Sequence, residues 1–163
     1  MTFEGASGAE FSPCKTYRYA LWRKWDASLP KILFIGLNPS RANEYYNDPT
    51  ITRCVDFAAR WGYGGLYFGN LYAYRSPYPA EVVNAMKKDE AVGPRTDEFL
   101  KLMAAQCDKI VFAWGSWPFI IDRQQIVRTM FPDAFCFGFN QGGYPKHPLY
   151  LKKTSQLTPY QLV

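Results

Sequence analysis

The sequence lacks the short motifs that mark the best-known enzyme classes. It has no G-x-S-x-G nucleophile turn, no G-x-x-x-x-G-K-[ST] phosphate loop and no G-x-G-x-x-G dinucleotide fingerprint. His147 is the only histidine and the acidic residues form no cluster, so neither a histidine-based metal site nor any other metal or cofactor is predicted. A Ser–His–Asp triad stays open, although no residue is marked as a nucleophile.

Cysteine pairs and long apolar runs are also absent. The four cysteines, Cys14, Cys54, Cys107 and Cys136, form no C-x-x-C pair, which argues against a zinc knuckle or an iron–sulfur cluster. No apolar run approaches the roughly 20 residues needed to cross a membrane, and the N-terminal residues lack the pattern of a signal peptide. The sequence therefore predicts a cytoplasmic protein with no membrane partner.

Aromatic residues and positive charge are what the sequence has in excess. Twelve Phe, twelve Tyr and five Trp supply core volume and stacking surfaces. The formal net charge of +5 suits an anionic partner, and nucleic acid is the first candidate. The length predicts one domain, residues 1–163, in which residues 1–13 form a flexible arm. Composition does not reveal the oligomeric state, and a monomer is the expectation.

Short apolar runs alternate with helix-like segments along the chain. The run Lys31–Ser40, KILFIGLNPS, predicts a buried strand that ends in a polar loop. Asp48 and Pro49 predict a helix start, as its N-cap and first residue. Strands are predicted over 17–25, 31–37, 66–72, 109–114 and 134–139, and helices over 49–61, 80–86, 95–107 and 118–130. The pattern indicates an α/β fold with a central, mostly parallel four-stranded sheet flanked by helices and an additional N-terminal edge strand, residues 17–25.

Polar or turn-forming residues follow three of these predicted strands. Asn38, Asn70 and the Trp114–Gly115 pair each stand at the carboxyl end of an apolar run. Right-handed crossovers bring such ends to one edge of a parallel sheet, where ligands bind. We expect a second loop, Lys146–Leu151, which carries His147, to face Asn38 across this site.

Two short motifs resemble those of the uracil-DNA glycosylase superfamily. Gly36-Leu37-Asn38-Pro39 is similar to the motif that holds the catalytic water there, and His147-Pro148 is similar to the motif that precedes the C-terminal helix. Asn70 stands where the superfamily places an Asn that reads the base edge. More narrowly, residues 17–152 resemble a bacterial and phage family, domain of unknown function 1643, in the patterns RYxLxRxW, GLNPS, NDPT, Gly-Tyr-Gly, NL, AWG and HPLYL.

The resemblance implies a metal-free DNA glycosylase that hydrolyses the N-glycosidic bond of a damaged or modified pyrimidine. Its catalytic residues are expected to be Asn38 and His147. The residues expected to bind substrate are Gly36, Leu37, Pro39, Ser40, Tyr45, Tyr46, Asn70 and Trp114. The residues expected to bind DNA are Leu151, as the wedge that fills the gap left by a flipped base, and Arg75, Lys146, Lys152 and Lys153.

Two departures from the resembled motifs, at Ser40 and at Leu149–Tyr150, and the Asn form of the first motif affect the expected substrate, reaction rate and wedge residue. Ser40 follows Pro39 where strict uracil enzymes carry a Tyr that excludes a 5-methyl group, so a 5-substituted base such as thymine or a modified cytosine is expected. Asn38 supplies an amide where the fastest relatives supply a carboxylate, which predicts slow chemistry. Leu149 and Tyr150 replace a small Ser-Pro pair, and this change bears on the wedge assignment.

The same residues have competing interpretations. Asn38 can be an ordinary turn residue, Asn70 can be a polar cap at the end of a strand, and His147 can have a purely structural role. Asp48 is interpreted as a helix cap, with a catalytic acid as the alternative. The alternative functions are a non-catalytic nucleic-acid- or nucleotide-binding module and an N-glycosidase that acts on free nucleosides.

Overall fold

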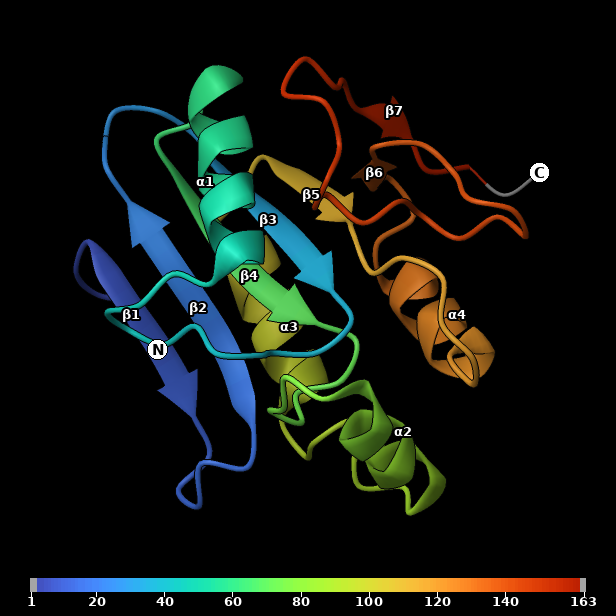
Figure 1. Ribbon diagram of the computed structural model, residues 1–163. Coiled ribbons are helices and arrows are strands. Elements are labelled where there is room, and N and C mark those ends of the chain that lie inside the picture. Colours follow the sequence, from blue (N-terminus) through green and yellow to red (C-terminus); the bar gives the residue numbers. More distant parts are fainter. Residues whose placement is uncertain (1–2, 162–163) are drawn as a thin grey trace.

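The computed structural model describes residues 3–161, which form one mixed sheet with helices on both faces (Figure 1). The strands are β1 (Ser7–Phe11), β2 (Arg18–Lys24), β3 (Lys31–Gly36), β4 (Gly65–Asn70), β5 (Lys109–Phe112), β6 (Phe135–Cys136) and β7 (Thr158–Pro159). The helices are α1 (Pro49–Arg60), α2 (Pro79–Lys87), α3 (Thr96–Ala104) and α4 (Ile121–Met130). None of the helices in this range is long and apolar enough to span a membrane.

Four parallel strands form the middle of the sheet, but the sheet is larger than the sequence pattern predicted. Its order within residues 3–161 is β1-β2-β4-β3-β5-β6-β7. β3 pairs in parallel with β4 and β5, and β5 with β6, whereas β1, β2 and β7 pair antiparallel. The α/β class is confirmed, and the prediction of a four-stranded, mostly parallel sheet is wrong. β6 lies within the predicted strand 134–139 but is only two residues long, and β7, also of two residues, is too short to leave a strand pattern in the sequence.

The N-terminal part of the sheet also departs from expectation. Ser7–Phe11, in the segment expected to be a flexible arm, is the edge strand β1. β2, expected at the edge, lies between β1 and β4, and six of its seven residues are buried. Its basic residues Arg18 and Arg23 are therefore buried. The alternation of basic and aromatic residues in this segment predicts, in contrast, that one face of the strand is exposed to solvent.

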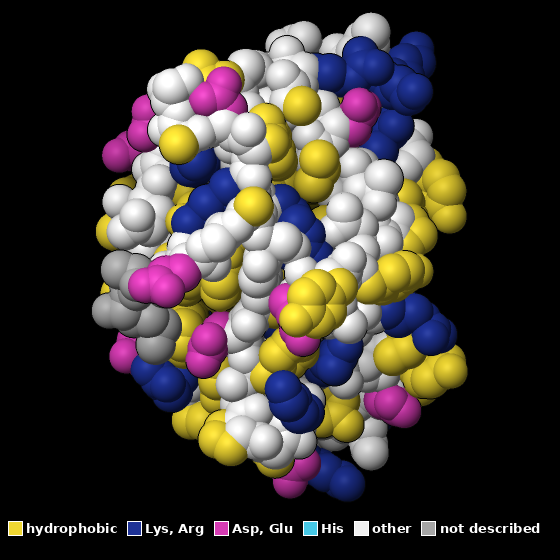
Figure 2. Space-filling view, turned by 90° about the vertical axis from the view of Figure 1, so that its left-hand side faces the viewer, with side chains coloured by type: hydrophobic (Ala, Val, Ile, Leu, Met, Phe, Trp, Pro, Cys, Tyr) yellow, Lys and Arg dark blue, Asp and Glu magenta, His cyan; other side chains and the backbone are white. Residues whose placement is uncertain are grey.

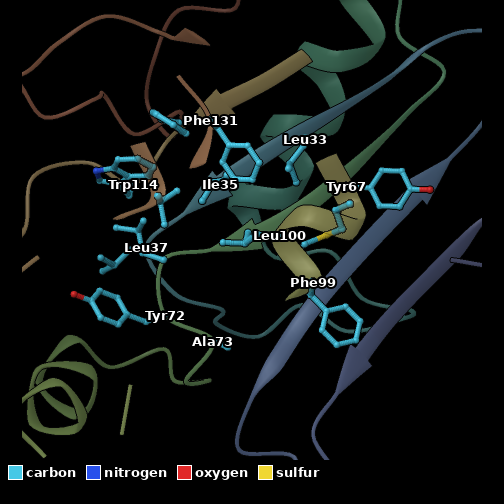
Figure 3. Close-up of a cluster of buried hydrophobic side chains, with 14 of the residues drawn as sticks. Leu33, Ile35, Leu37, Tyr67, Tyr72, Ala73, Phe99, Leu100, Trp114 and Phe131 are labelled. Carbon is cyan, nitrogen blue, oxygen red and sulfur yellow. The ribbon is translucent and has the colours of Figure 1, made fainter. Parts of the chain in front are cut away.

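Two hydrophobic clusters cover the two faces of the sheet. On β3, Ile32 and Phe34 belong to the cluster that includes α1, while Leu33 and Ile35 belong to the cluster that includes α3 and α4. Figure 1 shows α1 in front of the sheet and α3 behind it. Figure 3 shows the second cluster, in which Leu33 and Ile35 lie near Leu100 of α3. Burial on both faces explains why β3 reads as a continuous apolar run.

Helix α1 begins where the sequence predicts. Asp48 is its N-cap, because Oδ1 accepts a hydrogen bond from the N–H of Ile51 at 3.0 Å, and Pro49 follows as the first helical residue. After the helix, Gly62 takes a left-handed conformation with a φ of 86°. The helix start is tied to the loop after β3, because Asp48 Oδ2 accepts a hydrogen bond from the N–H of Ala42 at 3.3 Å.

Candidate functional site

A pocket of about 180 Å³ lies at the carboxyl ends of β3 and β4. Its walls come from the loops after β3, β4 and β5, the starts of β2 and α1, and the C-terminal segment. Its polar lining includes Arg18, Asn38, Ser40, Asp48, Asn70 and His147. This is the sheet edge at which the sequence predicts a site, and it brings Asn38, Asn70 and His147 together.

The side-chain amide of Asn38 is held by three backbone carbonyl groups. Its Nδ2 donates to the carbonyl oxygens of Pro39 at 2.9 Å, Tyr74 at 3.2 Å and Ser76 at 2.9 Å. Because all three partners are acceptors, the NH₂ group must face them, and the orientation of the amide is fixed. Oδ1 is thereby turned away from these carbonyl groups. Of the polar side-chain atoms of Asn38, which lines the pocket, Oδ1 is therefore the one left to bind a ligand, as a hydrogen-bond acceptor.

Asn70 stands opposite Gly36 in the parallel pairing of β4 with β3. Its side chain is 3% exposed, and neither Nδ2 nor Oδ1 has a hydrogen-bond partner among the described residues. A buried polar group without a partner costs about 1–3 kcal/mol, so an unpaired amide in a native protein requires an explanation. A ligand in the pocket that carries both a donor and an acceptor would satisfy both atoms.

The loop that carries His147 is tied to the carboxyl edge of the sheet by main-chain hydrogen bonds. The N–H of Gly115, just after β5, donates to the carbonyl of Pro145 at 3.0 Å. The N–H of Lys146 donates to the carbonyl of Gly138, after β6, also at 3.0 Å. These bonds explain how a residue so late in the chain reaches the ends of β3 and β4.

The protonation state of His147 follows from its surroundings. The N–H of Leu149 donates to Nδ1 of His147 at 3.1 Å, so Nδ1 is an acceptor and the proton of the neutral ring is on Nε2. Burial lowers the pKa of His147 below its ordinary value of 6.5, while the charge of nearby Asp48 opposes this shift. His147 is therefore neutral at pH 7 and has an N–H donor on Nε2.

Asp48 and Arg18 bring opposite charges into the pocket wall, and both are buried. Ala42 joins them, since its carbonyl accepts a bond from Nη1 of Arg18 at 3.0 Å while its N–H donates to Asp48. Burial lowers the pKa of Arg18 to about 10, and the charge of Asp48 opposes this, so Arg18 stays protonated at neutral pH. Within residues 3–161, Asp48 forms no salt bridge, and no three His, Cys, Asp or Glu side chains form a group that could hold a metal ion.

Most, but not all, of the expected substrate-binding residues line the pocket. Those that do are Gly36, Leu37, Pro39, Ser40 and Asn70. Tyr45 and Tyr46 do not, and their side chains are 89% and 51% exposed on the loop before α1. Trp114 is fully buried in the cluster of Figure 3, where its Nε1 donates to Oε1 of Gln124 at 3.0 Å. The expectation that Trp114 contacts substrate is therefore corrected, because Trp114 belongs to the core.

The structure also corrects the expected wedge. Leu151 is half-buried and packs against the hydrophobic cluster on the α1 side of the sheet, so its side chain is not free to enter a duplex. Its neighbour Tyr150 is 92% exposed and takes a left-handed conformation with a φ of 71°. The side chain that projects from this segment is therefore that of Tyr150.

The cations expected to contact DNA lie in different environments, and none of them lines the pocket. Lys152 and Lys153 are exposed, whereas Lys146 is half-buried. The guanidinium of Arg75 lies 4.8 Å from the centre of the Phe11 ring. Figure 2 shows that on the face at the β1 edge basic side chains are interspersed with acidic and hydrophobic ones. The net positive charge is therefore not gathered into a continuous band on that face.

Nine of the sixteen described residues that line the pocket are not among the site residues predicted from the sequence, and three of these nine are Arg18, Asp48 and Trp117. Asp48 is assigned as a helix cap, Arg18 is placed on a solvent-exposed strand face, and Trp117 has no assignment. A helix that begins after the loop of a buried parallel strand starts at the ligand-binding edge, and this signal could have marked Asp48. No comparable signal marks Trp117.

Comparison with known proteins identifies a family but no function. The chain matches no curated protein and no solved structure. One family matches residues 18–149, a range that runs from Arg18 to beyond His147 and so includes every residue that lines the pocket. The chain therefore belongs to the family described as Protein of unknown function (DUF1643).

Proposed function

We propose that this protein hydrolyses the N-glycosidic bond of a damaged or modified pyrimidine in DNA. The observation that carries the proposal is that Asn38, Asn70 and His147 line one pocket in which the amide of Asn70 is buried without a partner. A cavity of about 150 Å³ holds a benzene molecule, so a pocket of about 180 Å³ suits a single flipped base.

Asn70 is proposed to read the hydrogen-bonding edge of the base. A pyrimidine presents donors and acceptors side by side on this edge, and an amide side chain has both kinds of group. Neither amide atom of Asn70 has a partner within residues 3–161, so binding a base breaks no hydrogen bond between this side chain and that part of the protein. The free energy gained when the buried amide forms hydrogen bonds to the base then contributes in full to base binding.

His147 is proposed to stabilise the departing base. When the C1′–N bond breaks, its electron pair moves onto the base, and negative charge develops on the base oxygen. A neutral imidazole whose Nδ1 is occupied by the N–H of Leu149 can donate from Nε2 to this oxygen. The orientation is set before the substrate arrives, so no reorganisation is needed during the reaction.

Asn38 is proposed to position the attacking water. Its NH₂ group is committed to three carbonyl groups, which leaves Oδ1 to accept a hydrogen bond from the water. An amide oxygen orients water but does not take its proton, because it is too weak a base. The contribution of Asn38 is therefore proximity and orientation.

Ser40 is proposed to set the specificity at the 5-position of the pyrimidine. Ser40 lines the pocket and is small, so it leaves space for a substituent such as a methyl group. We therefore expect a 5-substituted pyrimidine to be released at least as fast as uracil. Efficient release of uracil with no release of any 5-substituted base would contradict this assignment of Ser40.

Outside the pocket, Tyr150 and the lysines are proposed to hold the DNA. The exposed ring of Tyr150, three residues after His147, is available to stack in the gap left by the flipped base. Lys152 and Lys153 are exposed nearby in the sequence and suit phosphate contacts, which weaken as salt is added.

The test is the formation of abasic sites in DNA. Oligonucleotides that contain one uracil, mismatched thymine or 5-substituted cytosine are incubated with the protein, treated with alkali and resolved by size. We expect strand cleavage at the modified position with the wild type and at least 100-fold slower cleavage with Asn38→Ala and His147→Ala.

The matched control is Asn84→Ala, which removes an exposed asparagine on α2 outside the pocket and should leave the cleavage rate unchanged. A salt-sensitive gel shift with every base intact would instead indicate a binding module. Release of bases from free nucleosides but not from DNA would indicate a nucleosidase.

A further inference from the structure

The pocket contains a buried carboxylate that has no part in the roles proposed for Asn38, Asn70 and His147. Asp48 is 6% exposed and lines the pocket together with Asn38 and His147. Its two oxygens accept hydrogen bonds only from main-chain N–H groups, those of Ile51 and Ala42, in the part of the chain that the structure describes. Asp48 forms no salt bridge there. Its charge acts on two buried cations, Arg18 and Arg23, but neither guanidinium hydrogen-bonds to it among the described residues. A buried carboxylate that makes no salt bridge is costly to desolvate.

The hydrogen bonds of Asn38 explain why position 38 cannot itself supply a carboxylate to the pocket. Three carbonyl oxygens converge on Nδ2 of Asn38, at 2.9–3.2 Å. A carboxylate at this position would place a negatively charged oxygen against three acceptors and could not bond to any of them. The fold therefore requires an amide at position 38, and this amide has no charge to offer a cationic sugar.

A second observation, at Asn70, points to a ligand in the pocket that Asp48 lines. Asn70 lines the same pocket, is 3% exposed and has two unpartnered amide atoms. In the proposed function the base of the nucleotide binds at Asn70 and the attacking water is held at Asn38. The sugar of that nucleotide would then lie between these two residues. Asp48 and His147 are close enough for the charge of Asp48 to affect the pKa of His147.

We propose that Asp48 is a catalytic residue whose carboxylate stabilises the positive charge on the sugar, an inference that rests on the proposed glycosylase function. The C1′–N bond breaks and its electron pair leaves with the base, which hydrogen-bonds to His147. The sugar carries the resulting positive charge, which faces Asp48 across a desolvated pocket. The water held by Asn38 then adds its oxygen to C1′ and loses one proton to solvent, and the base takes a proton from solvent.

The first experimental arm compares Asp48→Asn with Asp56→Asn. Asparagine caps helices about as well as aspartate, so Asp48→Asn removes the charge and retains the N-cap bond from the N–H of Ile51, although it loses the weaker bond from the N–H of Ala42. Asp56 lies on the same helix, has a side chain that is 42% exposed, and forms a salt bridge with Arg60 at the surface, which makes it a matched control. We expect Asp48→Asn to slow single-turnover base release at least 100-fold with DNA affinity changed less than threefold, and Asp56→Asn to match the wild type.

The second arm measures binding and does not require turnover. One DNA probe carries a pyrrolidine in place of the sugar ring, which is cationic at neutral pH, and the other carries a neutral tetrahydrofuran. The wild type should bind the cationic probe at least tenfold more tightly, and Asp48→Asn should lose this preference. Asp48→Ser, which also retains a capping side chain, provides a second variant if Asp48→Asn does not fold.

The two arms separate failure of the inference from failure of the proposed function. Base release by Asp48→Asn at the wild-type rate, or an unchanged preference for the cationic probe, would overturn the role of Asp48. A different result would contradict the glycosylase function and support the charge role of Asp48. In that case the wild type releases no base but prefers the cationic probe, and Asp48→Asn loses this preference.

Discussion

Gly36 and Asn70 lie opposite each other at the ends of β3 and β4, and a Cβ atom added to Gly36 would lie 3.0 Å from Oδ1 of Asn70. The same Cβ would lie 2.9 Å from Cε1 of Phe68, closer than ordinary van der Waals contact. The glycine in the GLNPS sequence thus provides the space in which the Asn70 amide lies. This relationship links the end of β3 to the base recognition that we propose for Asn70.

The first prediction concerns this contact. Gly36→Ala should lower the rate of base release about tenfold or more, because the new methyl group displaces the Phe68 ring or the Asn70 amide. The control is Gly62→Ala, where the added Cβ has open space but the left-handed φ is strained. Gly62→Ala should lose about 1 kcal/mol of stability and retain its release rate. Equal rates for the wild type and Gly36→Ala would contradict the prediction.

The second prediction separates stability from function at Asn70. Asn70→Leu should raise the free energy of unfolding by about 1 kcal/mol, because it replaces an unpaired buried amide by an apolar group of similar size and leaves no other group without a partner. The same variant should lose base release. Chemical denaturation and the alkali assay measure the two effects, and a destabilised variant that still releases bases would be the opposite of this expectation.

The third prediction concerns the amide of Asn38. Asn38→Asp should lower the free energy of unfolding more than Asn38→Ala, because it places a carboxylate against three carbonyl oxygens. Asn38→Ala should lose about 1–3 kcal/mol, because it leaves those carbonyl groups without their donor. Urea denaturation of the two variants decides the order. An Asp variant as stable as the wild type would show that the three carbonyl contacts do not restrict this position.

The fourth prediction is the pH dependence that His147 produces. Burial lowers the pKa of His147, so the unfolded chain takes up a proton at a higher pH than the folded protein does. The stabilising contribution of the neutral ring is therefore complete above a pH of about 6.5 and is lost as the pH falls through the lower, folded-state pKa. Base release should follow the same direction, with a constant rate from about pH 8 to 6.5 and a decline only below that.

The control for the pH profile is His147→Gln, which does not titrate in this range. The difference in unfolding free energy between the wild type and His147→Gln should shrink as the pH is lowered from about 7 to 5. A difference that does not vary with pH, or a wild-type rate that already falls above pH 7, would contradict the proposed neutral state of His147.

The residues that local chemistry determines could be predicted from the sequence. An apolar run that ends in Gly-Leu-Asn-Pro-Ser reads as a buried strand and its loop, and Gly36–Ser40 indeed lines the pocket. Asp48 and Pro49 carry the chemistry of a helix start, and α1 begins there. Asn38 and Asn70 could be placed together because parallel strands end at the same edge of a sheet.

The residues that depend on distant contacts could not be predicted in this way. β7 exists because Thr158–Pro159 pairs with β6, which its own two residues do not encode. Trp114 looks like a strand-end residue in the sequence, but packing from α4 buries it completely. Tyr150, not Leu151, projects from its segment because Leu151 packs against the cluster on the α1 side of the sheet, a contact between distant parts of the chain.

The most direct test of the account is the mass of a DNA strand before and after incubation with the protein. A duplex and a single strand, each with one 5-substituted pyrimidine, are incubated with the wild type and with Asn70→Leu, and the intact strands and the free base are measured by mass spectrometry. We expect the wild type to convert the strand to its abasic form and to release one free base per strand, while Asn70→Leu leaves the mass of the strand unchanged. Unchanged strand masses with the wild type, across uracil, thymine and modified cytosines, would contradict this expectation.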